Sequence, residues 1–120
     1  MEAAKTILGQ SDIESFDAMA PNEKLTVSIK GCDDLVFEKV GPTRLSVGHR
    51  TVRRGGRVRD PEAVFRIEGG AWIPIEYTSG TAVHRYDATG LAVEPLLGQW
   101  GERLRQQGFL EATTERVSTP

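Results

Sequence analysis

The sequence predicts an α+β domain, in which a single curved antiparallel sheet of five or six strands forms a meander. An N-terminal helix flanks this sheet and a C-terminal helix packs on it. Between residues 24 and 87, apolar residues alternate with polar ones, which is the period of a half-buried strand. The alternating segments are separated by short Gly- or Pro-containing turns, and short connections make neighbouring strands pair. The flanking segments carry apolar residues at three- and four-residue spacing, as one face of a helix does.

The N-terminal helix is predicted over residues 13–19. Its apolar face is formed by residues that repeat every three positions: Ile13, Phe16 and Met19. Ser11 or Asp12 is expected to cap the start of this helix. Gly9 is expected to separate it from the first turn of the chain.

The strands are expected at residues 24–30, 35–40, 43–52, 58–69, 69–78 and 81–87. Gly55 and Gly56 supply the positive φ that a tight hairpin turn between the third and fourth strands requires. Pro61 has no amide donor, so the fourth strand is expected to begin there or to be an edge at that point. Pro74 is expected to face an unpaired side or a bulge. His49 is expected to point inward and to be hydrogen-bonded.

The closing helix is predicted over residues 93–110, with Glu94 and Pro95 in its first turn and Gly108 at its end. Residues 1–112 are expected to form a single α+β domain, and residues 113–120 a flexible polar tail. Trp72, from the sheet, and Trp100, from the closing helix, are both expected to be largely buried.

Composition fits one globular domain, since 38% of the 120 residues are apolar and 27% are charged. The net charge of -2 argues mildly against a dedicated nucleic-acid binder, although a local cluster can override the total. The single cysteine excludes an intramolecular disulfide and a CxxC metal site. The start of the chain lacks the pattern of a signal peptide, and no apolar run reaches membrane-spanning length. We therefore expect a cytoplasmic protein without membrane contact.

An arginine cluster is the main functional lead. It lies on the predicted third hairpin and contains Arg50, Arg53, Arg54, Arg57 and Arg59. Guanidinium groups on a protruding ribbon suit phosphates or an acidic protein surface. The alternative is a solvated hairpin tip, in which Asp60 and Glu62 pair with Arg57 or Arg59. These five arginines are the predicted binding residues.

Catalytic and cofactor motifs are not predicted. Ser46 and His49 are close in sequence, but their segment lacks the GxSxG pattern of a nucleophile elbow. The two histidines, His49 and His84, lack the HxH or HxxxH spacing of metal ligands. The Gly-Gly-Arg turn is followed by neither Gly-Lys-Ser/Thr nor a helix start, so it is not a phosphate-binding loop. We expect no catalytic residue, no metal and no cofactor.

The order of several short motifs resembles a small domain of unknown function that occurs in proteins of plasmids, phages and other mobile elements. The matching positions span about residues 24–110 and are His49, Asp60-Pro61-Glu62, Trp72, Pro74-Ile75, Tyr77, Trp100 and Gln107-Gly108-Phe109. The hairpin tip departs from the family's pattern, because arginines stand where a polar, often acidic, turn is expected. The resemblance implies an accessory protein of a mobile element and brings no catalytic residue with it.

The leading hypothesis is a non-enzymatic accessory binding protein that contacts nucleic acid or an acidic protein surface through its Arg-rich hairpin. A protein-protein inhibitor or adaptor, for example of a host defence system, is the alternative, and it would act through a sheet edge or a helix face. A small enzyme of unknown class is the third hypothesis. A homodimer through a sheet edge or a helix face is a further expectation, because the strand at 24–30 has no proline to guard its edge.

Overall fold

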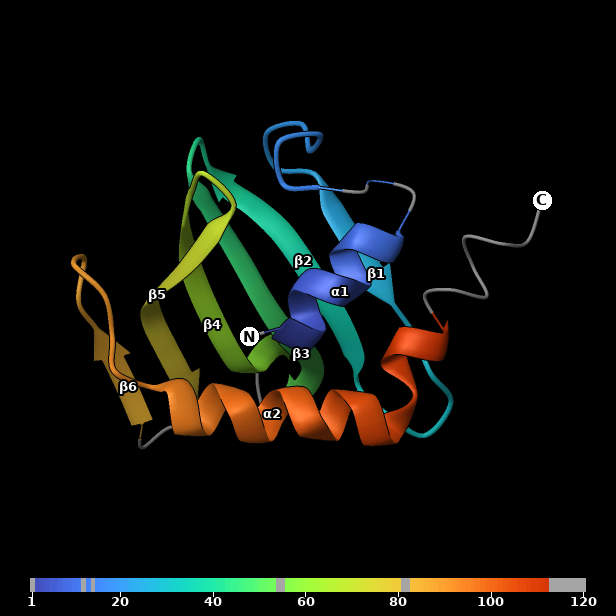
Figure 1. Ribbon diagram of the computed structural model, residues 1–120. Coiled ribbons are helices and arrows are strands. Elements are labelled where there is room, and N and C mark those ends of the chain that lie inside the picture. The colour runs from blue at the N-terminus through green and yellow to red at the C-terminus, as the bar shows by residue number, and fades with distance from the viewer. Residues whose placement is uncertain (1, 12, 14, 54–55, 81–82, 113–120) are drawn as a thin grey trace.

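A computed structural model of the chain describes residues 2–11, 13, 15–53, 56–80 and 83–112. Its elements follow in the order α1 (Glu2–Gln10), β1 (Lys24–Val27), β2 (Asp34–Gly41), β3 (Arg44–Arg53), β4 (Gly56–Glu68), β5 (Ala71–Ser79), β6 (Val83–Tyr86) and α2 (Glu94–Gln107). Figure 1 shows α1 lying across the sheet and α2 running along one end of it. In the described part of the chain, no helix is long and apolar enough to cross a membrane.

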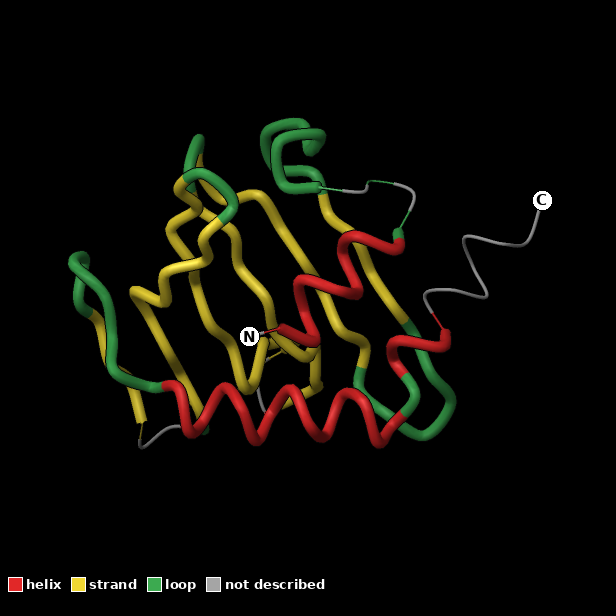
Figure 2. Tube along the Cα trace, viewed as in Figure 1, coloured by secondary structure: helices red, strands yellow, loops and turns green. Residues whose placement is uncertain are grey.

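The six strands form one antiparallel sheet in the order β1-β2-β3-β4-β5-β6. Each strand pairs with its neighbour in sequence, so the sheet is a meander, and Figure 2 shows it curving around the helices. The predicted fold class, α+β with a single open antiparallel sheet and a helix from each end of the chain, is confirmed.

The core fills the space between the helices and one face of the sheet. Leu35 and Phe37 on β2 and Leu45 and Val47 on β3 are fully buried there, as period-two alternation requires. The helices contribute a second set of buried residues to the same cluster: Ala3, Ala4, Ile7, Leu8, Leu97, Trp100 and Leu104. Each large apolar side chain removed from water contributes about 1.5–3 kcal/mol.

The N-terminal helix lies earlier than the sequence predicts. α1 covers Glu2–Gln10 and includes Gly9, whereas residues 13–19, where they are described, form bends and turns. Residues 3, 4, 7 and 8 of α1 are buried, and this i, i+3, i+4 stripe fits a helix better than the strict period of three. Phe16 and Met19 are buried too, but they reach the core from a loop. Asp12 lies outside the described residues.

Ser11 also has a different role from the predicted cap of a helix start. Its hydroxyl donates to the carbonyl oxygen of Leu8 at 2.7 Å, and its amide donates to the same oxygen at 3.1 Å. Ser11 therefore satisfies a free carbonyl at the end of α1.

Pro61 does not begin β4, which starts at Gly56, but β4 is an edge at that point, because its pairing with β5 starts only at Glu62. Along β3 the strand continues through Pro61, and a bulge absorbs the residue. Gly48 is paired with Glu62 and Arg50 with Arg59, so two residues of β4 stand opposite one residue of β3. The missing amide donor of proline is tolerated at such a bulge. A second register shift, between β4 and β5, lies beside Pro74, which confirms the bulge expected there.

The closing helix follows its predicted signals. α2 has a proline in its first turn and ends at Gly108, which has a φ of 90° in the left-handed region and donates its amide to the carbonyls of Leu104 and Arg105. Trp100 is only 4% exposed, as predicted. Trp72 also packs against the core, but it is less completely buried than Trp100.

Candidate functional site

The β3–β4 hairpin extends beyond both neighbouring strands. β2 pairs with β3 as far as Arg50 and no further, and the pairing of β4 with β5 starts at Glu62. Residues 51–53 and 56–58 therefore pair only with each other. Val58 on this ribbon is 43% exposed. The end of the hairpin is thus a two-stranded ribbon that pairs with no third strand, and Gly56 and Val58 on it are exposed.

Arg50 and Arg59 lie at the base of the ribbon, and both are paired with carboxylates. Arg50 Nη2 is 2.9 Å from Asp34 Oδ2. Arg59 Nη2 is 2.6 Å from Glu38 Oε1, with both side chains 19% exposed, and Arg59 Nη1 is 3.5 Å from Glu62 Oε2. The expected pairing of Glu62 with Arg59 is confirmed. These two guanidinium groups are therefore largely neutralised by the protein itself.

Ser46 completes the group around Arg59. Its side chain is 1% exposed, it accepts a hydrogen bond from Arg59 Nη1 at 3.1 Å, and its hydroxyl donates to Glu62 Oε2. Three strands, β2, β3 and β4, are joined on one face by Glu38, Ser46, Arg59 and Glu62. In this network Arg59 connects the three strands, and both hydrogen bonds of the Ser46 hydroxyl are made within it.

The other three predicted arginines belong to the tip. Arg53 and Arg57 are strand residues at the end of the ribbon, where Arg53 pairs with Gly56 and Arg57 with Val52. The side chains of Arg53 and Arg57 and the whole of Arg54 lie outside the described residues. Between Arg50 and Arg59 the sequence contains no Asp or Glu, and the nearest acids along the hairpin are Asp60 and Glu62, which follow Arg59. The predicted set therefore divides into a neutralised base and a basic tip.

His49 ties the base of the hairpin to α2. The indole Nε1–H of Trp100 donates to His49 Nε2 at 2.8 Å, and His49 Nδ1 is 3.3 Å from the carbonyl oxygen of Asp33. Because Nε2 accepts, the proton of the neutral ring belongs on Nδ1. Burial lowers the pKa of His49, an effect that outweighs the hydrogen bond and the charge of Asp33. The expected hydrogen-bonded strand histidine is confirmed.

A small cavity of about 150 Å³ lies beside this contact and brings α2 into the candidate site. Arg103 of α2 lines it together with Asp60, His49 and Trp100. Arg103 is not among the residues predicted from the sequence, because no local pattern connects residue 103 to the hairpin. The sequence does offer one indication that Arg103 lies near His49. Arg103 follows Trp100 by three residues, and residues three apart share a helix face.

The two histidines do not share a site. His84 lies on β6, where its Nε2 is 2.7 Å from Glu76 Oε2, whereas His49 lies on β3, separated by two strands in the sheet order. Within the residues that the structure describes, no three or more His, Cys, Asp or Glu side chains are arranged to hold a metal ion.

The fold and this surface define a small α+β domain with an open antiparallel meander and a projecting basic hairpin. The sequence profile of one family matches residues 5–110, and its description is "Domain of unknown function (DUF6908)". The chain belongs to this family, so the resemblance to a small domain of unknown function is confirmed. No curated protein and no solved structure matches the chain.

Proposed function

We propose that the protein is a non-enzymatic accessory binding protein whose β3–β4 hairpin contacts the phosphate backbone of nucleic acid. The observation that supports this proposal is the division of the arginines. Arg50 and Arg59 are paired with carboxylates at the base, while Arg53, Arg54 and Arg57 occupy a tip whose sequence contains no acid. The mobile-element setting that the resemblance implies stays a prediction.

The shape of the ribbon favours phosphate contacts. Residues 51–53 and 56–58 project past β2 and β5, and a two-stranded ribbon is narrow enough to enter the major groove of a duplex. Arginine at such a tip can donate two hydrogen bonds to one phosphate. Contacts of this kind give affinity and position without base specificity.

Carboxylates neutralise the two arginines at the base of the ribbon. Like charges close together on a ribbon repel each other, and the pairs Arg50–Asp34 and Arg59–Glu38 remove that repulsion where the ribbon joins the sheet. Within residues 50–59, we infer that the positive charge left for a partner is that of the tip arginines, even though the whole chain has a net charge of -2. Binding should consequently involve few phosphates and should be strongly weakened by salt.

The experiment is a titration of a fluorescent random-sequence duplex of about 20 base pairs at several salt concentrations between about 50 and 200 mM. In the test variant, Arg53, Arg54 and Arg57 are replaced with Gln. In the matched control, the exposed residues Arg44, Arg85 and Arg105 are replaced with Gln, so that both variants lose the same charge.

We expect the control to bind much like the wild type, apart from a small change due to net charge. The tip variant should bind more weakly, and the slope of log affinity against log salt should fall by about 0.9 for each phosphate that the variant no longer neutralises. Equal affinity of the two variants, or no binding by the wild type at low salt, contradicts the proposal. Tip-dependent binding to an acidic polypeptide in place of the duplex identifies a protein surface as the target.

The edge strand β6 favours a second candidate, a protein-protein adaptor or inhibitor. β6 pairs only with β5, and all four of its residues are exposed, including Val83 at 39% and Tyr86 at 54%. An edge strand with apolar side chains can pair with a strand of another chain. The homodimer expected from the sequence rests on the strand at 24–30, which is the other edge strand, β1. Because β6 is exposed along its whole length and β1 is not, we propose that β6 of each copy pairs with the other.

A further inference from the structure

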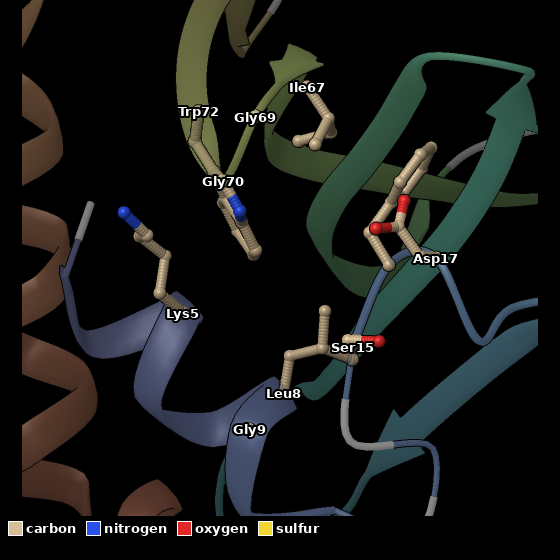
Figure 3. A pocket seen from close by; sticks show the side chains of 10 residues that line it. Lys5, Leu8, Gly9, Ser15, Asp17, Ile67, Gly69, Gly70 and Trp72 are labelled. Carbon is tan, nitrogen blue, oxygen red and sulfur yellow. The ribbon is translucent and has the colours of Figure 1, made fainter.

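A cavity of about 230 Å³ lies between α1, the loop at residues 15–17 and the β4–β5 turn (Figure 3). It is at the opposite end of β4 from the arginine tip. β4 is 13 residues long, so at about 3.3 Å per residue its two ends are separated by up to roughly 40 Å. Any ligand of this cavity would therefore bind independently of the hairpin.

An aromatic side chain forms one wall. Trp72 is only partly buried, and its indole projects into the cavity between Lys5 and Asp17 in Figure 3. The ring is held from behind by Phe65, with ring centroids 5.4 Å apart and an interplanar angle of 53°. Phe16 also lines the cavity. The Phe16 side chain is only 6% exposed, and Lys39 Nζ lies 4.4 Å from its ring centroid, so Trp72 provides most of the aromatic surface of the cavity. A partly buried indole that is packed against Phe65 favours a flat apolar group.

Two opposite charges flank this wall. Lys5 and Asp17 lie on opposite sides of the cavity in Figure 3. Lys5 Nζ is 3.8 Å from Glu2 Oε1, a long pair in which the Glu2 side chain is 79% exposed, and such pairs contribute little. Asp17 is exposed and makes no ion pair with a described residue. Both charges are therefore available to a ligand.

We propose that this cavity binds a small aromatic zwitterion, namely a free aromatic amino acid. The ring would pack against Trp72 and Phe16, the carboxylate would face Lys5 and the ammonium would face Asp17. The size agrees with this class, because a cavity of about 150 Å³ can hold benzene. At about 230 Å³, the cavity has room for a ring with a short polar chain. It is smaller than the roughly 300–1,000 Å³ of sites for drug-sized ligands.

The two tryptophans of the chain allow a direct test by NMR of their indole N–H groups. Phenylalanine, which has no indole of its own, is titrated into the full-length protein, and the Trp72 signal is assigned by its loss in Trp72→Phe. We expect the Trp72 signal to shift and saturate while the Trp100 signal, which belongs to the His49 contact, stays in place. Phenethylamine, which lacks the carboxylate, and phenylpropanoate, which lacks the ammonium, should each bind about two- to five-fold more weakly.

Variants separate the cavity from non-specific binding. A Cβ atom built on Gly9 meets nothing within 4 Å, so Gly9→Leu can fill the cavity without a backbone clash and should weaken binding at least ten-fold. Lys5→Gln and Asp17→Asn should each weaken phenylalanine binding about two- to five-fold. The exposed residues Lys24 and Glu102 give matched controls, Lys24→Gln and Glu102→Gln, which should bind like the wild type.

An unmoved Trp72 signal at saturating phenylalanine overturns the proposal, as does equal binding of phenylalanine, phenethylamine and phenylpropanoate. If Gly9→Leu fails to fold by circular dichroism, Lys5→Gln and Asp17→Asn decide, and affinities equal to those of their controls overturn it. The variant with Gln at Arg53, Arg54 and Arg57 should still bind phenylalanine, so failure at the hairpin and failure at the cavity can be told apart.

Discussion

The hydrogen bond between Trp100 and His49 is expected to make the stability of the domain depend on pH. The indole N–H of Trp100 donates to His49 Nε2 at 2.8 Å, and His49 Nδ1 faces the carbonyl of Asp33 at 3.3 Å. A second proton on His49 would place two N–H donors against each other at Nε2. The folded state therefore holds His49 neutral, in agreement with the lowering of its pKa by burial.

The direction of the pH effect follows from this lowered pKa. In the unfolded chain His49 titrates near its ordinary value of 6.5, so on acidification the unfolded chain takes up the proton before the folded domain does. The free energy of unfolding is then constant above pH 6.5 with respect to this group. It falls as the pH drops from 6.5 toward the folded-state pKa, with a limiting slope of about 1.4 kcal/mol per pH unit. Asp33 raises the pKa of His49 and Arg103 lowers it.

Two variants isolate the contribution of the contact. Trp100→Phe keeps an aromatic ring but leaves His49 Nε2 without its donor, which should cost about 1–3 kcal/mol at pH 7.5. Trp100→Ala, which removes the whole buried side chain, should cost about 3–5 kcal/mol. In His49→Gln the group no longer titrates, so the loss of stability below pH 6.5 should shrink relative to the wild type.

Urea unfolding, followed by circular dichroism between pH 5 and pH 8, measures these free energies independently of tryptophan fluorescence. His84→Gln serves as the control, because His84 is exposed and pairs with Glu76, and this variant should keep the acid-dependent loss. If wild type and His49→Gln lose the same stability between pH 6.5 and pH 5, the contact does not hold His49 neutral and the reasoning fails.

Two further predictions concern the sheet. A Cβ atom at Gly48 would lie 3.0 Å from the carbonyl oxygen of Pro61 and 3.2 Å from the Cβ atoms of Arg59 and Glu62. Gly48→Ala should therefore lower the free energy of unfolding by about 1–3 kcal/mol through overpacking. An unchanged melting temperature would show that the bulge can move away from the added methyl group. If β6 mediates the proposed homodimer, light scattering should give a dimer for the wild type and a monomer for Val83→Lys, whereas a wild-type monomer at high micromolar concentration excludes it.

The sequence predicts those parts of the fold in which a local pattern and a local signal agree. The six strands follow the alternation of apolar residues, and α2 follows Pro95 at its start and Gly108 at its end. The position of α1 was not predictable in this way. Two segments have buried residues at a spacing compatible with a helix: residues 3, 4, 7 and 8, and Phe16 with Met19. Only packing in the folded domain makes the first segment the helix and the second a loop.

The remaining differences depend on long-range contacts. The bulge at Pro61 is possible because Gly48, on the neighbouring strand β3, leaves room for it. Trp72 stays partly exposed because α1 and the loop at 15–17 leave a cavity beside it. Arg103 joins the hairpin region only through the packing of Trp100 on His49. The residues that decide these three features are distant in sequence from Pro61, Trp72 and Arg103, so a local sequence pattern could not predict them.

The arginines at the base and at the tip of the hairpin should respond in opposite ways to substitution. Arg59 has Glu38, Glu62 and Ser46 as partners, so Arg59→Gln leaves two carboxylates without their cation.

Because Arg59 and Glu38 are each only 19% exposed, this substitution should cost about 1–3 kcal/mol of stability, and Glu38→Gln in the same chain should recover part of it. Arg57→Gln, in the ribbon that has no acid of its own, should change stability by no more than about 0.5 kcal/mol and should lower duplex affinity.

A double-mutant cycle by urea unfolding measures the stability changes, and the salt titration measures the duplex affinity. Equal stability losses for Arg57→Gln and Arg59→Gln would show that the tip is held by internal ion pairs as well, and the hairpin would then be a structural element with no charge left for a partner.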